Sequence, residues 1–368
     1  MAANDTDRSW VEISESALRH NLHAVREQIG LDAKIISVVK ANAYGHGVEL
    51  VHRALSEQTD LFAVANLTEA LELQSFGCRK PILLLSPSLP VEYAAIASAG
   101  FIPTISSVQE AEAYQMHASG SQHLIHFAVD SGMGRIGTWI QDAMAQIVRI
   151  AQMPHISIHS ISTHLPSADE DGVFTKTQLE QFAEFCDTVK AQFPYIACHA
   201  LNSAGIQQFS DYALDMVRPG LMLYGATSVR SFREKLKPVL SWKARVLLVR
   251  DIPAGRSISY GRTFVTPSAL RAATLSVGYA DGYPWQSSSR HAAVLLGGKH
   301  CRILGRVTMD QIVVDAIGAD VKPGDIATLI GSDGEETIRA EEVAERALTI
   351  AWDVFTAIGQ RVQRIAVE

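Results

Sequence analysis

Residues 35–47 read IISVVKANAYGHG, and they contain the signal that decides the fold. The run at 35–39 is apolar and mostly β-branched, which is typical of a strand buried on both faces of a parallel sheet. Lys40 follows this run directly. Upstream, apolar residues recur at helical spacing from Leu18 to Ile29, and Ser14 is the predicted N-cap of that helix. The stretch therefore predicts a helix followed by a strand with a lysine at its carboxyl end.

The same alternation of apolar runs and helical patterns continues through about residue 230. Seven further apolar runs follow the first, at residues 61–65, 82–85, 101–105, 124–129, 156–163, 196–201 and 214–217. Eight strand–helix units within about 200–250 residues are typical of a TIM barrel. The main competing interpretation is a doubly wound parallel sheet. We predict an eight-stranded α/β barrel over residues 1–235.

The pattern of apolar runs and turn residues changes after about Arg233. The apolar runs become short, at residues 242–252, 272–277, 294–296, 312–314 and 326–330. Turn signals such as Asp281-Gly282 and Pro323-Gly324 separate them. This pattern predicts a mostly-β domain over residues 236–368, with one helix at 340–348.

Composition excludes several classes of protein. The 368 residues include 32 basic and 39 acidic side chains, a net charge of −7, so the chain lacks the basic footprint of a nucleic-acid binder. The first ten residues lack the apolar segment of a signal peptide, and no apolar run is long enough to span a membrane. The four cysteines and the histidines show no metal-ligand spacing. We expect a cytoplasmic protein with reduced thiols that binds no metal, nucleic acid or membrane.

Lys40 is the first candidate functional residue. In a barrel, the carboxyl ends of the strands carry the active site. Apolar surroundings lower the pKa of a lysine, and a neutral amine can attack a carbonyl to form a Schiff base. The alternative is a lysine that caps a strand in solvent, as most lysines do.

The loops after the predicted strands 7 and 8 form a second constellation. A barrel commonly binds phosphate there. Ser203 offers a hydroxyl, Gly220 allows backbone N–H groups to approach an anion, and Arg218 stands beside Lys40 where the barrel closes. A lysine, an arginine and a phosphate cradle at one mouth suggest pyridoxal 5'-phosphate, with Arg218 facing the ring nitrogen. On pattern alone, Asn202-Ser203 is also an ordinary helix cap and 218–220 an ordinary turn.

Four further features stand in distinctive segments. Tyr260 and the segment 305–310 each resemble a β-turn next to a strand. His164 follows the predicted strand 6 and faces the same mouth, or is a structural histidine. Arg135 lies in a glycine-rich loop near the expected anion, or on the surface.

Taken together, these motifs resemble the alanine racemase family. They occur in the family's order and span most of the chain. The matching segments are residues 38–47, 130–135, 163–164, 168–170, 202–205, 218–225, 259–261, 278–283 and 305–310.

The resemblance implies a homodimer of barrel and β domain that interconverts L- and D-alanine with pyridoxal 5'-phosphate. Lys40 would hold the cofactor and exchange a proton on one face of the substrate Cα. Tyr260, from the other subunit, would act on the opposite face. Arg218 would pair with the pyridine nitrogen, and His164 would support Arg218 and Tyr260.

The resemblance also assigns the remaining candidates to three groups. The phosphate and its surroundings would be held by Tyr44, Asn202, Ser203, Gly220 and Met222. The substrate carboxylate would meet Arg135 and the backbone of Met309. The substrate entrance would include Tyr279, Arg306 and Asp310.

Four positions depart from the family pattern and leave the substrate open. Ala128 stands where some members carry a carbamylated lysine that orients the substrate arginine, and Gln360 where some have a phosphate-binding tyrosine. Trp285 and Pro166 replace an arginine and a small residue. Serine or a broader set of amino acids is therefore also a candidate substrate.

Two competing functions would use the same cofactor without racemisation. One is a barrel-type amino-acid decarboxylase, which needs no tyrosine on the opposite face of the substrate. The other is a non-enzymatic carrier of the cofactor, which would consist of a lone barrel. Tyr260 argues against both functions, and the second domain argues against the carrier.

Overall fold

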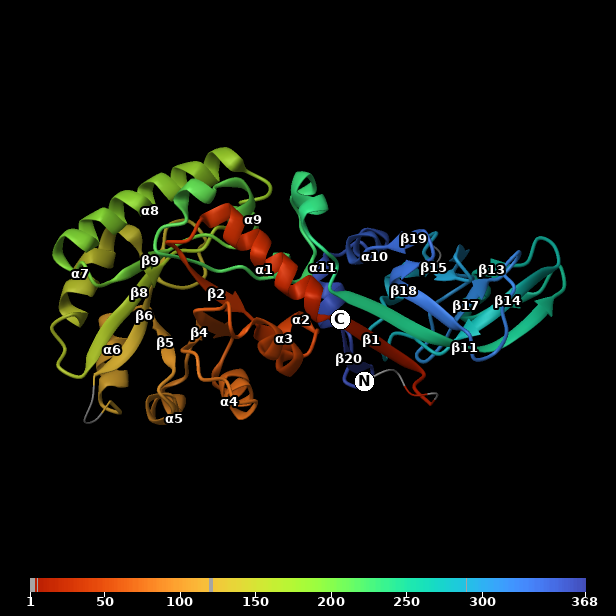
Figure 1. The fold of residues 1–368 in the computed structure, drawn as a ribbon, viewed down its shortest axis with the longest axis horizontal. Coiled ribbons are helices and arrows are strands. Elements are labelled where there is room, and N and C mark those ends of the chain that lie inside the picture. The colour runs from red at the N-terminus through yellow and green to blue at the C-terminus, as the bar shows by residue number, and fades with distance from the viewer. Residues whose placement is uncertain (1–3, 5, 119–121, 289) are drawn as a thin grey trace.

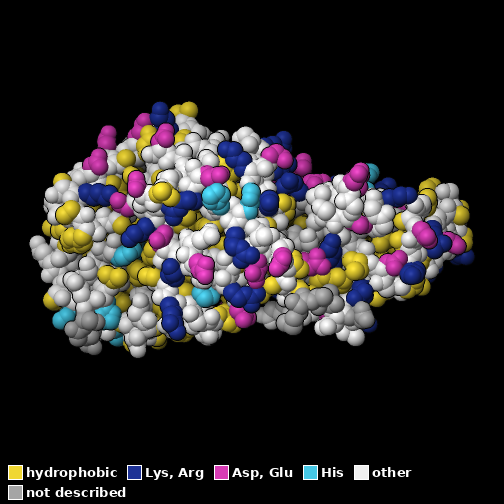
Figure 2. Space-filling view, in the orientation of Figure 1, with side chains coloured by type: hydrophobic (Ala, Val, Ile, Leu, Met, Phe, Trp, Pro, Cys, Tyr) yellow, Lys and Arg dark blue, Asp and Glu magenta, His cyan; other side chains and the backbone are white. Residues whose placement is uncertain are grey.

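A computed structural model describes residues 4, 6–118, 122–288 and 290–368. A barrel and a sheet-rich domain lie next to each other along the long axis of the molecule (Figure 1). No helix in the described ranges has the length and apolar character needed to cross a bilayer. Acidic and basic side chains intermingle on the face seen in Figure 2.

All eight apolar runs of the first part form parallel strands. They are β2 (Lys34–Val38), β3 (Leu61–Val64), β4 (Ile82–Pro87), β5 (Ile102–Ile105), β6 (His123–Asp130), β8 (Ile156–Ser162), β9 (Ala197–His199) and β10 (Met216–Val217). Their order is β5-β4-β3-β2-β10-β9-β8-β6, and β5 pairs with β6, so the sheet closes on itself. A short strand, β7 (Thr138–Trp139), extends from β6. The predicted barrel is confirmed and the doubly wound sheet is wrong, because an open sheet would have two edges.

Helices surround the ring of strands (Figure 1). They are α1 (Glu15–Ile29), α3 (Val48–Leu55), α4 (Leu67–Ser75), α5 (Tyr93–Ala99), α6 (Val108–Gln115), α7 (Ile140–Ile150), α8 (Gly172–Gln192) and α9 (Ser203–Gln208), with 3-10 turns η1 (Pro90–Glu92), η2 (Ser210–Tyr212), η3 (Leu221–Tyr224) and η4 (Arg230–Lys235). The Ser14 hydroxyl accepts a hydrogen bond from the Ala17 N–H, which confirms the predicted cap of α1.

The second part is built on one branched sheet. Its main path is β16 (Lys299–Arg302), β15 (Ala293–Leu296), β18 (Ile326–Asp333), β11 (Leu240–Ile252), β1 (Ser9–Ser14) and β20 (Gln363–Val367). Strands β14 (Leu270–Leu275), β17 (Ile312–Asp315) and β19 (Glu336–Ile338) branch from it, and β12 (Ser257–Ile258) pairs with β13 (Phe264–Val265). The remaining elements are α10 (Ala340–Ala347), α11 (Ala351–Thr356), η5 (Tyr260–Arg262) and η6 (Trp285–Ser287).

The first strand of the chain belongs to the second sheet. Strand β1 pairs antiparallel with β11 and parallel with β20. The interpretation of residues 1–235 as one barrel did not include this exchange, because both partners of β1 lie more than 200 residues away. The Trp242 indole donates to the Ser9 hydroxyl at 2.9 Å, and both residues are buried. One continuous apolar core therefore runs from the barrel into the sheet-rich domain.

Candidate active site

Lys40 begins a left-handed turn at the end of β2. The turn is α2 (Lys40–Tyr44), in which Ala41, Asn42 and Ala43 have φ of 52–54° and ψ of 49–52°. Each non-glycine residue in this conformation costs about 1–2 kcal/mol. Two side-chain contacts stabilise the turn: Glu69 accepts from the Ala41 N–H at 2.9 Å, and Asn42 accepts from the Val48 N–H at 2.8 Å. Backbone strain of this kind persists only where the surroundings enforce it, and it concentrates at functional sites.

The environment of Lys40 favours its neutral amine. Burial lowers the pKa of Lys40, and the nearby positive charge of Arg135 lowers it further, while Glu69 acts in the opposite direction. The net shift is downward. This is the direction that the sequence predicts for a nucleophilic or basic lysine.

Four donors from three segments converge at the carboxyl end of β2, where the Val38 N–H donates to the Pro219 carbonyl at 3.0 Å. The Ser203 hydroxyl accepts hydrogen bonds from the Gly220 N–H at 2.9 Å and from the Met222 N–H at 3.2 Å. A Cβ atom on Gly220 would lie 2.6 Å from the Tyr44 hydroxyl oxygen. Burial raises the pKa of Tyr44 to about 12, so this phenol stays protonated and can donate. Two hydroxyls and two backbone N–H groups that lie this close together are the kinds of donors that bind a phosphate.

Asn202 positions this cradle rather than pointing into it. Its side-chain oxygen accepts from the Gly205 N–H at 2.9 Å and so caps α9. Its side-chain nitrogen donates to the Leu165 carbonyl at 3.3 Å. Both polar groups of Asn202 are thus engaged by the protein, and its assignment as a cofactor-binding residue stays a prediction.

Arg218 is buried at the barrel mouth among backbone acceptors. It donates to the carbonyls of Thr163 at 2.7 Å, Ala200 at 2.9 Å and His199 at 3.2 Å. Burial lowers the pKa of Arg218 to about 10, so the guanidinium remains charged at neutral pH. Burial and the nearby charge of Arg218 also lower the pKa of His164 to about 3, so His164 is neutral.

Two histidines that the sequence analysis did not select lie beneath Arg218. A guanidinium nitrogen of Arg218 contacts Nδ1 of His199, and the His199 ring lies over that of His126 with centroids 4.9 Å apart. The hydroxyls of Ser160 and Ser162 each lie 2.9 Å from a His126 ring nitrogen. Burial lowers the pKa of both histidines, so neutral rings lie beside the buried cation. The sequence did contain a signal for these two residues. Each histidine stands inside a predicted strand that is otherwise mostly apolar.

Tyr260 belongs to the sheet-rich domain and not to the barrel whose mouth carries Lys40. It is 71% exposed in η5, next to the short strand β13. Figure 1 shows β13 in the part of the sheet-rich domain that is distant from the barrel. One chain therefore does not bring these two predicted catalytic residues together.

The predicted entrance residues gather in the sheet-rich domain. Tyr279 and Trp285 line a cavity of about 450 Å³, and the Arg306 guanidinium lies 5.9 Å from the centre of the Trp285 ring. Met309 is 52% exposed, and its carbonyl accepts from the Ala280 N–H at 3.0 Å.

Arg135, Ala128 and Gln360, which bear on substrate and phosphate recognition, lie outside the entrance loops. Arg135 is exposed in the loop after β6, whose shape is set by Asp130 accepting three backbone N–H groups. Ala128 is buried on β6, and Gln360 is exposed in the turn before β20.

Fold and site together define a class of protein. It is a (β/α)8 barrel with an attached β domain, in which a lysine with a lowered pKa, a buried arginine and an anion cradle share one mouth. Residues 13–228 match the family described as alanine racemase, N-terminal domain, and residues 239–366 match alanine racemase, C-terminal domain. This chain belongs to the alanine racemase family.

Relatives match over nearly the whole length. A protein of Halothermothrix orenii named alanine racemase is 40% identical over 98% of this chain and 97% of its own. One of Methylacidiphilum infernorum is 38% identical over 97% of this chain and 92% of its own. The solved structure of alanine racemase from Clostridium difficile has a TM-score of 0.92 at 31% identity, covering 99% of this chain and 96% of that one. The structure from Bacillus anthracis, with bound L-Ala-P, has a TM-score of 0.90 at 33% identity, covering 100% and 96%.

Proposed function

We propose that this protein is an alanine racemase that interconverts L- and D-alanine with pyridoxal 5'-phosphate. The observation that carries the proposal is the placement of Lys40, with its lowered pKa, next to the cradle of Tyr44, Ser203, Gly220 and Met222. The relatives named alanine racemase, similar over nearly the full chain, support it.

The residues at the barrel mouth fit the cofactor. Lys40 would hold it covalently, the cradle would hold its phosphate, and Arg218 would face its ring nitrogen. When bound, pyridoxal 5'-phosphate supplies an electron sink for the negative charge left on the substrate Cα. A guanidinium has donors and no acceptor, so Arg218 would keep the ring nitrogen unprotonated and limit the lifetime of that charge. This favours prompt return of the proton over side reactions.

Racemisation needs a proton acceptor on one face of Cα and a donor on the other. The Lys40 amine would move the proton on one face. The Tyr260 hydroxyl of a second subunit would move it on the other, so the functional unit would be a homodimer with shared sites. Both groups ordinarily titrate near pH 10 and must be tuned toward neutral pH. Burial and the nearby charge of Arg135 lower the pKa of Lys40, which is the required direction.

Alanine is the first substrate to test. Arg135 and the Met309 N–H would bind its carboxylate, and Tyr279, Arg306 and Asp310 would line its entrance. Ala128 supplies no charge to orient Arg135, so serine or a broader set of amino acids is the alternative. A decarboxylase needs no tyrosine on the opposite face, which is why Tyr260 favours a racemase.

Chiral chromatography tests the proposal. The cofactor-loaded protein is incubated with single L-amino acids and, separately, with D-alanine. Both enantiomers of alanine should approach a 1:1 ratio from either side, because enantiomers have equal free energies in water. Formation of a decarboxylated amine, or no D-alanine at all, would contradict the proposal.

Gly220→Ala should weaken cofactor binding. The new Cβ would lie 2.6 Å from the Tyr44 hydroxyl oxygen, so it would displace one of the groups assigned to the phosphate. Overpacking costs about 1–3 kcal/mol, which corresponds to a dissociation constant raised about 5- to 140-fold. Absorbance titration of the apoprotein measures it. Gly172→Ala is the matched control, because its nearest neighbour would be Phe209 at 3.8 Å. An unchanged constant for Gly220→Ala would remove Gly220 from the phosphate site.

Gln360→Tyr should strengthen cofactor binding. Gln360 is exposed in the turn before β20 and stands where some family members carry a tyrosine that binds the phosphate. One net hydrogen bond contributes about 0.5–1.5 kcal/mol, so the cofactor dissociation constant should fall by up to about tenfold. Gln152→Tyr, on an exposed turn after α7, controls for the added aromatic ring. If both variants bind the cofactor as the unaltered protein does, residue 360 does not face the phosphate.

A further inference from the structure

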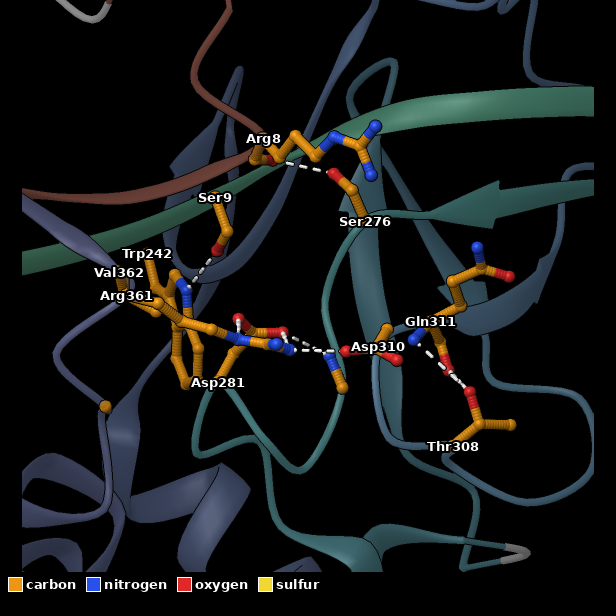
Figure 3. Close-up of polar contacts among 12 residues, drawn as sticks. Arg8, Ser9, Trp242, Ser276, Asp281, Thr308, Asp310, Gln311, Arg361 and Val362 are labelled. Carbon is orange, nitrogen blue, oxygen red and sulfur yellow. Dashed lines mark hydrogen bonds and ion pairs between the residues drawn. The ribbon is translucent and has the colours of Figure 1, made fainter.

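One arginine joins the two loops that carry the predicted entrance and carboxylate-binding residues. Arg361 lies in the turn between α11 and β20. Its Nε donates to one Asp281 carboxylate oxygen at 2.6 Å, and its Nη2 donates to the other at 3.1 Å. The same Nη2 donates to Asp310 at 2.8 Å. Figure 3 shows Arg361 between these two carboxylates.

The two loops also contact each other through their backbones. The Tyr279 N–H donates to the Thr308 carbonyl, and the Ala280 N–H to the Met309 carbonyl, each at 3.0 Å. A Cβ on Gly278 would lie 2.3 Å from both carbonyl oxygens, so only glycine permits this approach. The position of the Met309 peptide therefore depends on the 278–283 loop.

Asp281 is the centre of this arrangement. Its side chain is only 8% exposed, whereas those of Arg361 and Asp310 are 48% and 60% exposed. Besides Arg361, its carboxylate accepts from the Gly278 N–H at 2.8 Å, and its carbonyl accepts from the Gly359 N–H at 2.9 Å. Without Arg361, a buried carboxylate would lose its cation, and the loop would have to move to bring it into water.

We propose that Arg361 is a positioning residue that holds the Met309 peptide where it binds the substrate carboxylate. This rests on the proposed function, in which the Met309 N–H binds that carboxylate. Arginine is required because its planar fork binds two carboxylates at once, whereas lysine offers a point charge. Arg361 touches no reacting atom, so its effect should fall on binding rather than on chemistry.

Kinetics and ligand binding test this inference with Arg361→Gln and Arg361→Lys. An interaction that is equal in ground and transition states changes KM and leaves kcat unchanged. We expect Arg361→Gln to raise KM for alanine about tenfold with kcat within about threefold, the size of one weakened charge-assisted hydrogen bond. Arg361→Lys, which keeps the charge, should raise KM about threefold. Arg149→Gln, which breaks a surface ion pair with Glu112 on the barrel, is the control and should leave KM within twofold.

Propionate provides a readout that needs no turnover. It has the carboxylate of alanine without the amino group, and calorimetry measures its affinity for the cofactor-loaded protein. Its Kd should rise by the same factors as KM. The inference would be overturned if folded Arg361→Gln bound propionate with a Kd within twofold of that of the unaltered protein. If Arg361→Gln does not fold, the same criterion applies to Arg361→Lys. A lower kcat with unchanged KM would also overturn the inference. Failure of the unaltered protein to racemise alanine would instead contradict the proposed function, and the propionate measurements would still decide the role of Arg361.

Discussion

Lys40→Ala should lower the rate of alanine racemisation by about 10⁴-fold or more. A positioned general base alone contributes about 10²–10⁴-fold, and the same side chain would also hold the cofactor. The fold should persist, because the Glu69 carboxylate keeps its hydrogen bonds to the N–H groups of Ala41 and Ala65. The melting temperature should therefore change by only a few degrees.

Activity, melting temperature and peptide mapping test this expectation together. Borohydride reduction of the cofactor-loaded protein should leave a pyridoxyl group on Lys40 in the unaltered chain and none at that position in the variant. Lys176→Ala, an exposed lysine paired with Glu180 on α8, is the control and should keep full activity. A pyridoxyl group found on another lysine of the unaltered protein would contradict the assignment.

Mixed dimers of a Lys40→Ala subunit and a Tyr260→Phe subunit should regain up to half of the native activity. Each parent homodimer should be impaired by about 10²-fold or more, because each site lacks one proton-transfer group. If Tyr260 acts on the partner's barrel, one site of the mixed dimer collects both defects and the other is intact. The exposure of Tyr260 and the position of the neighbouring β13, away from the barrel of the same chain, are the reasons to expect this result.

A second pairing with the same two substitutions serves as the matched control. A subunit carrying both Lys40→Ala and Tyr260→Phe is paired with an unaltered subunit. If sites are shared, each then has one defect and the dimer should be nearly inactive; if they are not shared, one site is intact and half of the activity remains. The two pairings, isolated through different affinity tags, must give opposite results. Activity confined to the second pairing would show that Tyr260 acts within its own chain.

Local patterns were sufficient for much of the fold. Each barrel strand is a short apolar run whose burial on both faces requires β-branched and aliphatic residues, so the run itself marks the strand. The cap at Ser14 and the helix that follows it depend on neighbours within one turn. The short β12 and β13 and the strands β16, β19 and β20 were missed. They are two to five residues long, which is too short for an alternation of apolar and polar residues to mark them.

Part of the candidate site could likewise be predicted from local sequence patterns, and part could not. The sequence placed Lys40, Ser203, Gly220 and Arg218 at strand ends, and the closed barrel brings those ends to one mouth. The role of Tyr260, by contrast, came only from resemblance to a family. Nothing local in its segment distinguishes a catalytic tyrosine from one in a β-turn.

The sequence by itself determined the eight-strand alternation, the lysine after the first barrel strand and the loops that follow the last two. These follow from side-chain periodicity and turn chemistry, which act over a few residues. Tertiary structure alone decided that β1 joins the second sheet, that His199 and His126 lie beneath Arg218, and that Arg361 connects Asp281 with Asp310. It also decided the left-handed turn after Lys40, which contains no glycine from Ala41 to Tyr44. The physical reason is that the groups stabilising these features come from distant parts of the chain, and only the folded protein brings them into contact.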